Sequence, residues 1–304
     1  MIRTLRALLG AALFFTAAHT AATAAALPSL PAPAESFEAG SIHVDRYGSG
    51  AQTLVFIPGL SCGPWEWAEA IGRFSKTATV YALTLDGFDG RTYVPNDDLF
   101  ATFTHDVYAL LDARKIERPV VIGHSLGGTL AFALAQAQPN RIAGFVSLDG
   151  LPVFPTMAQA PEASRKQAAA AMASQIAGET HDQMLAYDVG YMRSATLQSD
   201  LVQPAATLEA TSDPKATAAW LQADLDADLR PGLPAMNTPG LLLMPYASPS
   251  PYTLEQTTAF YQSLVHGAPR VTVVPIEGAR HFAMLDQPAA VDAAITRFLA
   301  SLSR

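Results

Sequence analysis

The chain has 304 residues, a length that fits one large α/β domain carrying an insertion. It contains 19 Lys and Arg against 27 Asp and Glu, a formal net charge of −8. No basic cluster interrupts this acidic background, so we expect neither nucleic acid nor an anionic membrane surface as a partner. Cys62 is the only cysteine, which excludes an internal disulfide.

The first 26 residues have the form of a secretory signal peptide. Arg3 and Arg6 supply a positive start, residues 8–18 are apolar but too short to span a bilayer comfortably, and Ala24-Ala25-Ala26 fits a cleavage site. We therefore expect a periplasmic or secreted protein that starts near Leu27 and has no membrane attachment after cleavage. An N-terminal anchor that is never cleaved is the alternative.

After a Pro- and Ala-rich lead-in at 27–39, apolar β-branched runs alternate with helical patterns. This alternation predicts a parallel sheet with right-handed crossovers. The expected strands are 41–47, 53–57, 80–85, 120–122 and 144–148, and the expected helices are 98–115 and 129–137.

The alternation stops between 152 and 238, where prolines and helix-like segments replace strands. Strand patterns return at 240–244 and 270–275, and apolar residues at helical spacing predict a closing helix at 289–302. We therefore expect a core in two parts, 27–151 and 239–304, separated by a helical cap at 152–238. The helices expected in the cap are 162–176, 181–192 and 214–225.

The segment Gly123-His124-Ser125-Leu126-Gly127 matches G-x-S-x-G and lies between a predicted strand and a predicted helix. A tight strand-to-helix turn exposes its central side chain and requires neighbours that are nearly free of side chains. The helix N-terminus then directs N–H groups at any anion that forms beside Ser125. The pattern predicts a nucleophile elbow, with a purely structural glycine-rich turn as the alternative.

With these motifs the chain resembles an α/β-hydrolase, a mostly parallel doubly wound sheet, in the serine branch that has a helical cap. The resemblance covers nearly the whole mature chain and includes the Pro58-Gly59-Leu60 turn and the late Gly278-Ala279-Arg280-His281. It implies that Ser125 is the nucleophile and His281 the general base. It also implies that the backbone N–H groups of Leu60 and Leu126 form the oxyanion hole.

The acidic partner of His281 departs from the family pattern. Relatives usually carry this carboxylate just after the strand that here is 240–244, but the following residues contain no Asp or Glu until Glu255. Some members place the acid after the preceding strand, where this chain has Asp149. We predict Asp149, within hydrogen-bond distance of His281 Nδ1, and keep Glu255 and the absence of any carboxylate as alternatives.

Aromatic residues follow the predicted oxyanion turn and the next strand. Trp65, Trp67 and Phe88 are candidates for the wall of a substrate pocket, although core packing explains them equally well. Methionines and tyrosines of the inserted helices are candidates for its roof, with packing inside the cap as the alternative. They are Met157, Met172, Met184, Met192, Tyr187 and Tyr191.

The residues favour an exported serine hydrolase that cleaves a carboxylic ester of a small apolar substrate through an acyl-enzyme, with an amide as second choice. No metal-ligand spacing and no dinucleotide motif is present, so we expect no metal and no cofactor. Alternatives on the same triad are a C–C bond hydrolase or a cofactor-free peroxidase. A non-catalytic ligand-binding or sensing protein is the alternative of another class. Oligomeric state cannot be inferred from the sequence.

Overall fold

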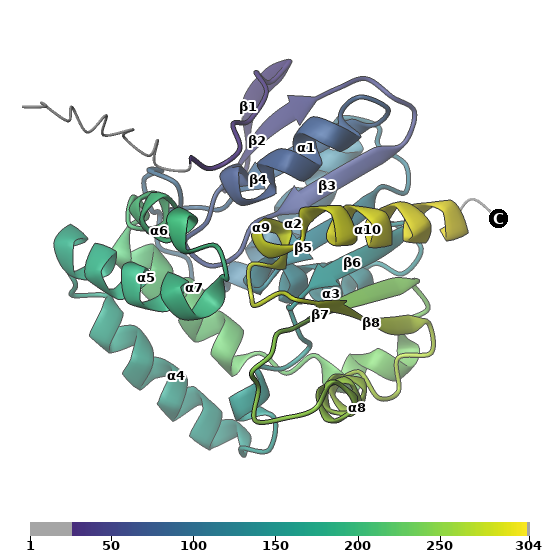
Figure 1. The fold of residues 1–304 in the computed structure, drawn as a ribbon. Helices are drawn as coiled ribbons and strands as arrows, with labels where there is room; N and C mark the ends of the chain where they lie inside the picture. Colours follow the sequence, from purple (N-terminus) through teal and green to yellow (C-terminus); the bar gives the residue numbers. More distant parts are fainter. Residues whose placement is uncertain (1–25, 303–304) are drawn as a thin grey trace, which may run out of the picture.

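The computed structural model describes residues 26–302, so the proposed signal peptide lies almost entirely outside the described residues. Eight strands form one sheet in the order β1-β2-β4-β3-β5-β6-β7-β8 (Figure 1). Only the β1–β2 and β2–β4 pairs are antiparallel. The predicted fold, a mostly parallel doubly wound sheet, is confirmed. The strands are β1 (Glu35–Ala39), β2 (Ile42–Tyr47), β3 (Thr53–Ile57), β4 (Thr79–Thr84), β5 (Val120–His124), β6 (Gly144–Leu148), β7 (Gly240–Tyr246) and β8 (Val271–Glu277).

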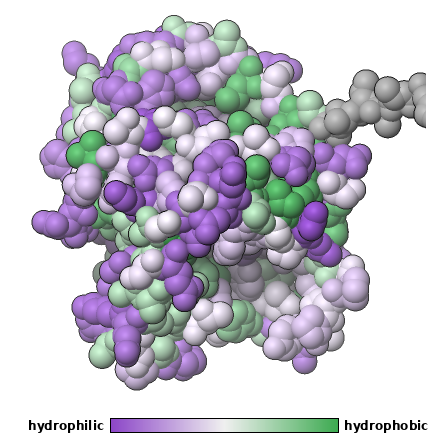
Figure 2. Space-filling model, turned by 90° about the vertical axis from the view of Figure 1, so that its left-hand side faces the viewer, coloured by the Kyte–Doolittle hydropathy of each residue, from purple (hydrophilic) through white to green (hydrophobic). Residues whose placement is uncertain are grey.

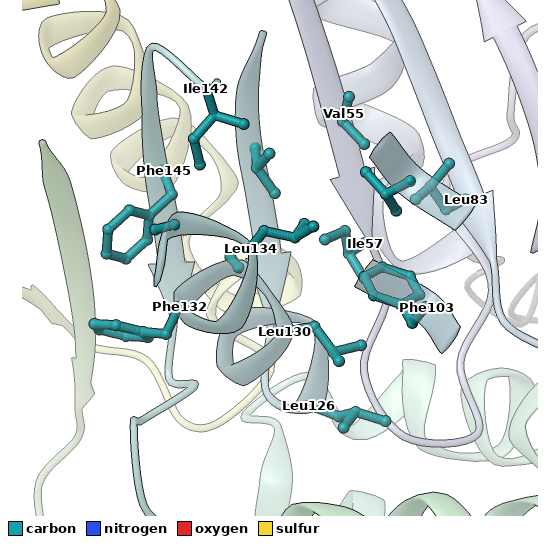
Figure 3. Packing of buried hydrophobic residues seen from close by; sticks show 14 of the residues in the cluster. Val55, Ile57, Leu83, Phe103, Leu126, Leu130, Phe132, Leu134, Ile142 and Phe145 are labelled. Carbon is teal, nitrogen blue, oxygen red and sulfur yellow. The ribbon is translucent and has the colours of Figure 1, made fainter. Parts of the chain in front are cut away.

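Helices cover both faces of the sheet, because its central strands are apolar on both sides. Along β3, Val55 and Ile57 belong to one buried cluster and Leu54 and Phe56 to the other, as the two-residue period of a strand requires. The first cluster includes residues of α2 (Leu99–Ala113) and α3 (Leu126–Ala137), and Figure 3 shows their packing. The second includes residues of α1 (Ala68–Phe74), α9 (Ala283–Asp286) and α10 (Pro288–Leu302).

The segment between β6 and β7 is helical. It contains α4 (Glu162–Ile176), α5 (His181–Ala195), α6 (Val202–Glu209) and α7 (Pro214–Asp226), which lie together beside one end of the sheet in Figure 1. Helix α4 packs on α7, and α5 packs on α6. Three short 3-10 helices complete the segment: η2 (Pro155–Met157), η3 (Ser199–Leu201) and η4 (Arg230–Ala235). In the view of Figure 2, taken from this side, hydrophilic residues dominate the surface and hydrophobic ones form separate patches.

The segment between α6 and α7 is joined to the loops that follow β3 and β4. The Ser212 hydroxyl donates to the Ser61 carbonyl at 2.9 Å, and the Asp213 N–H donates to the Gly87 carbonyl at 2.8 Å. The hydroxyls of Ser61 and Thr217 lie 2.8 Å apart. The helical insertion therefore lies against the carboxyl-end loops of the sheet, where α/β proteins place their sites.

The structure differs from the sequence prediction at several elements. The lead-in contains strand β1, which pairs with β2 alone and shows little hydrophobic signal. Helices α1, α6 and α8 (Leu254–Leu264) were not expected, and α3 begins three residues earlier than predicted. For α8 a signal existed: Thr253 and Gln256 form a capping box, a pattern of helix starts. Among the described residues, no helix combines the length and apolar character needed to cross a membrane.

Candidate active site

Ser125 occupies a sharp turn between β5 and α3, with φ 50° and ψ −122°. Its N–H donates to the Leu148 carbonyl of β6 at 2.9 Å, and its own carbonyl accepts from Gly128 N–H and Thr129 N–H as α3 begins. A Cβ at Gly123 would lie 2.0 Å from the Gly127 carbonyl oxygen, so a larger residue there would force this turn apart. The strained, glycine-flanked turn is the geometry that the motif predicts.

His281 and Asp149 are joined by a hydrogen bond of 2.6 Å between His281 Nδ1 and Asp149 Oδ2. His281 lies in the loop after β8, and Asp149 is the first residue after β6. The alternative carboxylate, Glu255, is an exposed residue in the first turn of α8. Of the possibilities considered from the sequence, the structure brings Asp149 to the imidazole. Such a carboxylate fixes the tautomer in which His281 Nε2 is free to accept a proton.

Tyr261 of α8 holds the other oxygen of this carboxylate. Its hydroxyl donates to Asp149 Oδ1. Burial, together with the negative charge of Asp149, raises the pKa of the Tyr261 phenol well above its usual range, so this group stays a donor. Sequence reasoning missed Tyr261, because no motif surrounds it and it lies 112 residues from Asp149 along the chain.

The turn that contains Leu60 lies against the elbow. A Cβ at Gly59 would be 3.4 Å from Ser125 Cβ, so the two backbones are close enough to share a reacting group. Leu126 is buried as the first residue of α3, whose N-terminal N–H groups favour negative charge. Of the two predicted oxyanion donors, Leu126 follows Ser125 directly in the chain, and Leu60 belongs to the turn that lies beside Ser125 in space.

The aromatic candidates for a pocket wall separate into two groups. Trp67 packs edge-on against Phe56 at 5.3 Å between ring centroids, and Phe88 packs on Trp220 at 6.3 Å. Both are fully buried, which matches the core-packing alternative. Trp65 instead stacks on Phe282, the neighbour of His281, at 6.5 Å.

One residue of the predicted roof lies beside His281. The ring of Tyr191 meets His281 edge-on, with 6.2 Å between centroids. Met184 and Met192 are buried, as packing within the insertion requires, and Met157 is half-buried. Met172, Tyr187 and Tyr191 itself are exposed. Tyr191 is therefore the member of this set that the structure brings to the site.

The insertion carries three buried carboxyl groups. Burial raises the pKa of Asp188 to about 7 and that of Asp224 to about 6. Burial also raises the pKa of Glu209 well above its usual range, and the Cys62 thiol donates to Glu209 Oε1 at 3.6 Å. Burial also raises the pKa of Cys62, which makes this thiol a poor nucleophile. Among the described residues, no group of three His, Cys, Asp or Glu is arranged to hold a metal ion.

Comparisons with known proteins agree with this fold. A family model described as "Alpha/beta hydrolase family" matches residues 54–294. A 2-succinyl-6-hydroxy-2,4-cyclohexadiene-1-carboxylate synthase from Klebsiella pneumoniae is 28% identical over 264 residues, covering 86% of this chain and 99% of that protein.

Solved structures include a thermophilic esterase from Thermogutta terrifontis, with TM-score 0.74 and 18% identity over 88% of this chain and 99% of that one. An enol-lactonase from Burkholderia xenovorans LB400 has TM-score 0.66 and 20% identity over 85% and 96%. The family match and the enzyme names of these relatives support a hydrolase. Since the family model covers most of its length, the chain belongs to the alpha/beta hydrolase family.

Proposed function

We propose that this protein is a serine hydrolase that cleaves a carboxylic ester of a small apolar substrate through an acyl-enzyme. Two observations together carry the proposal. Ser125 stands on a strained elbow, and His281, whose ring packs on that of the preceding residue His124, is hydrogen-bonded to a carboxylate at 2.6 Å. A nucleophile, a base and a group that orients the base are the three parts that acyl transfer needs. An amide is the second choice of substrate.

In the proposed reaction, Ser125 Oγ attacks the ester carbonyl carbon while His281 Nε2 accepts the hydroxyl proton. Asp149 accepts a hydrogen bond from the Nδ1–H of His281 and, through its negative charge, stabilises the imidazolium that forms. The N–H groups of Leu60 and Leu126 bind the oxyanion, with support from the N-terminus of α3. The intermediate then collapses, the alcohol leaves with the proton from His281, and a water molecule hydrolyses the acyl-enzyme by the same steps.

The helical insertion is proposed to act as a cap over this site. Its support is the contact of the α6–α7 segment with the loops after β3 and β4, and the position of Tyr191 beside His281. Apolar side chains near the base, namely Phe282 and the ring of Tyr191, favour an apolar acyl or alcohol group. Export to the periplasm or medium remains part of the proposal, on the strength of the N-terminal sequence.

A C–C bond hydrolase is the second candidate. It would use the same residues, and the relative that matches over 86% of the chain carries the name of a synthase rather than an esterase. A fold shared by esterase and non-esterase enzymes does not choose between them.

Covalent labelling tests the proposal first. A serine-reactive fluorophosphonate should label the wild-type protein at Ser125, and p-nitrophenyl esters of graded chain length should be hydrolysed. Ser125→Ala should abolish labelling and lower ester turnover by orders of magnitude, because the residues of a triad act as a unit. Ser301→Ala, which removes an exposed hydroxyl bonded to the Phe298 carbonyl within α10, is the control and should keep both activities. A Ser125→Ala protein that keeps more than about a tenth of the turnover contradicts a loss of that size.

Labelling without ester turnover would favour the C–C bond hydrolase. A folded wild type that resists labelling would favour a non-catalytic binding protein. Export is tested separately, by the intact mass of natively expressed protein, which should lack residues 1–26. Detection of the full-length mass alone would contradict export by cleavage.

A further inference from the structure

A second histidine–carboxylate pair, formed by His124 and Glu66, is buried next to the elbow and has no part in the reaction above. His124 is the last residue of β5, and Glu66 lies in the 3-10 helix η1 (Pro64–Trp67) between two tryptophans. The two side chains are 1% and 0% exposed. A carboxylate among apolar residues is costly unless its oxygens are satisfied, so its contacts must be accounted for.

The contacts form one hydrogen-bonded chain. Glu66 Oε1 accepts from the Gly59 N–H at 3.0 Å, and Glu66 Oε2 lies 3.0 Å from His124 Nδ1. At the other end of the ring, His124 Nε2 lies 3.1 Å from the His281 carbonyl oxygen. That carbonyl can only accept, so Nε2 carries a proton. His124 Nδ1 and Glu66 Oε2 are each other's partners, so every polar atom of the pair has a hydrogen-bond partner.

This chain of hydrogen bonds reaches each part of the proposed reaction centre. It begins at the turn that contains Leu60, passes through the residue before Ser125, and ends on the backbone of His281. The rings of His124 and His281 also pack together, with 4.6 Å between centroids. A Cβ at Gly59 would lie 2.9 Å from His124 Nδ1, so the turn and the ring leave no space between them.

We propose that Glu66 and His124 are positioning residues, which set the distances between the oxyanion turn, the nucleophile and the base. This inference rests on the proposed serine hydrolase function. A displacement of 1 Å at a reacting group can cost about 100-fold in rate, so a chain that ties three such groups together acts on kcat. It touches no substrate, and KM should therefore change little.

A matched pair of substitutions at Glu66 separates the effect of side-chain length on kcat from the effect of negative charge. Glu66→Gln keeps the length, since its amide oxygen can accept from Gly59 and its amide N–H can donate to a neutral His124. Glu66→Asp keeps the charge but is one methylene too short to reach both partners. We expect kcat within threefold of wild type for Gln and about 10- to 100-fold lower for Asp, at unchanged KM. Glu69→Asp, the same change at an exposed residue of α1, is the control and should have no effect.

His124→Phe removes the donor to the His281 carbonyl and should resemble Glu66→Asp. All variants are measured for kcat and KM on a p-nitrophenyl ester and for the rate of fluorophosphonate labelling. Circular dichroism verifies that each is folded, and the Gln–Asp pair decides alone if the Phe variant does not fold. A folded Glu66→Asp protein with wild-type kcat overturns the proposal, as does a Gln variant as slow as Asp. If wild type itself is neither labelled nor active, the proposed function fails instead.

Discussion

Replacing Tyr261 by phenylalanine tests how Asp149 is held. In the native protein the two carboxylate oxygens accept from different donors, Oδ1 from the Tyr261 hydroxyl and Oδ2 from His281 Nδ1. Phenylalanine keeps the ring, which packs against the buried cluster around α2 and α3, and removes only the hydroxyl. The carboxylate then has one donor fewer to fix its orientation toward the imidazole.

The size of the effect can be worked out from the hydrogen bond that is removed. A hydrogen bond to a charged group contributes about 1.5–3 kcal/mol, and about 1.36 kcal/mol corresponds to a tenfold change in rate. Asp149 loses one of its two fixed contacts and orients the imidazole less well, so kcat should fall by about tenfold. That loss is far smaller than the ~10⁴ that follows removal of a triad carboxylate.

The measurement is kcat and KM for a p-nitrophenyl ester. Tyr246→Phe is the matched control, since its hydroxyl donates to the Tyr252 carbonyl and not to Asp149. The control should keep the kcat of wild type. A folded Tyr261→Phe protein with wild-type kcat would refute the reasoning and leave Tyr261 a packing residue.

Two further changes give sharp expectations. Asp149→Asn should lower kcat for a p-nitrophenyl ester by up to about 10⁴, whereas Glu255→Gln, at an exposed position, should leave kcat unchanged. If Glu255→Gln instead lost the activity and Asp149→Asn kept it, the acid would lie on α8. Asp188 has a pKa raised by burial from 3.8 to about 7, so its ionisation destabilises the folded protein increasingly from about pH 4 and fully above pH 7. Asp188→Asn should therefore raise the free energy of unfolding more at pH 8 than at pH 4, with a difference of at most about 4 kcal/mol. Urea unfolding at the two pH values measures this difference, and an equal effect at both would contradict the expectation.

The sequence predicted those parts of the site that depend on local chain geometry. Ser125 lies between a strand and a helix, and the glycines around it show that a tight turn must form. His281 follows a strand and a glycine, and a loop at that edge of the sheet reaches the same crevice. Both positions could be found because neighbouring residues impose them.

Groups that reach the site from distant parts of the chain could not be predicted in this way. Tyr261 and Glu66 meet their partners only after the sheet has formed, and no motif around either residue indicates that partner. Glu66 did have one unusual feature, an acidic residue between Trp65 and Trp67 in a stretch that reads as buried. Such an acid must have a partner, although the sequence does not say which.

The position of Asp149 follows from the register of two neighbouring strands. In the parallel β5–β6 pair His124 lies opposite Leu148, so Ser125 and Asp149 are the next residues of each strand. Both turn sharply off the sheet, with φ of 50° and 54°, and each is anchored through its N–H to the adjacent strand, at Leu148 and Leu243 respectively. A carboxylate on β6 therefore starts one strand away from Ser125, whereas an acid after β7 would start two strands away. Tyr261, on the helix that follows β7, binds the second oxygen from that side. The loop after β7 can then lack an acid, because the donor that follows it holds the acid of β6 in place.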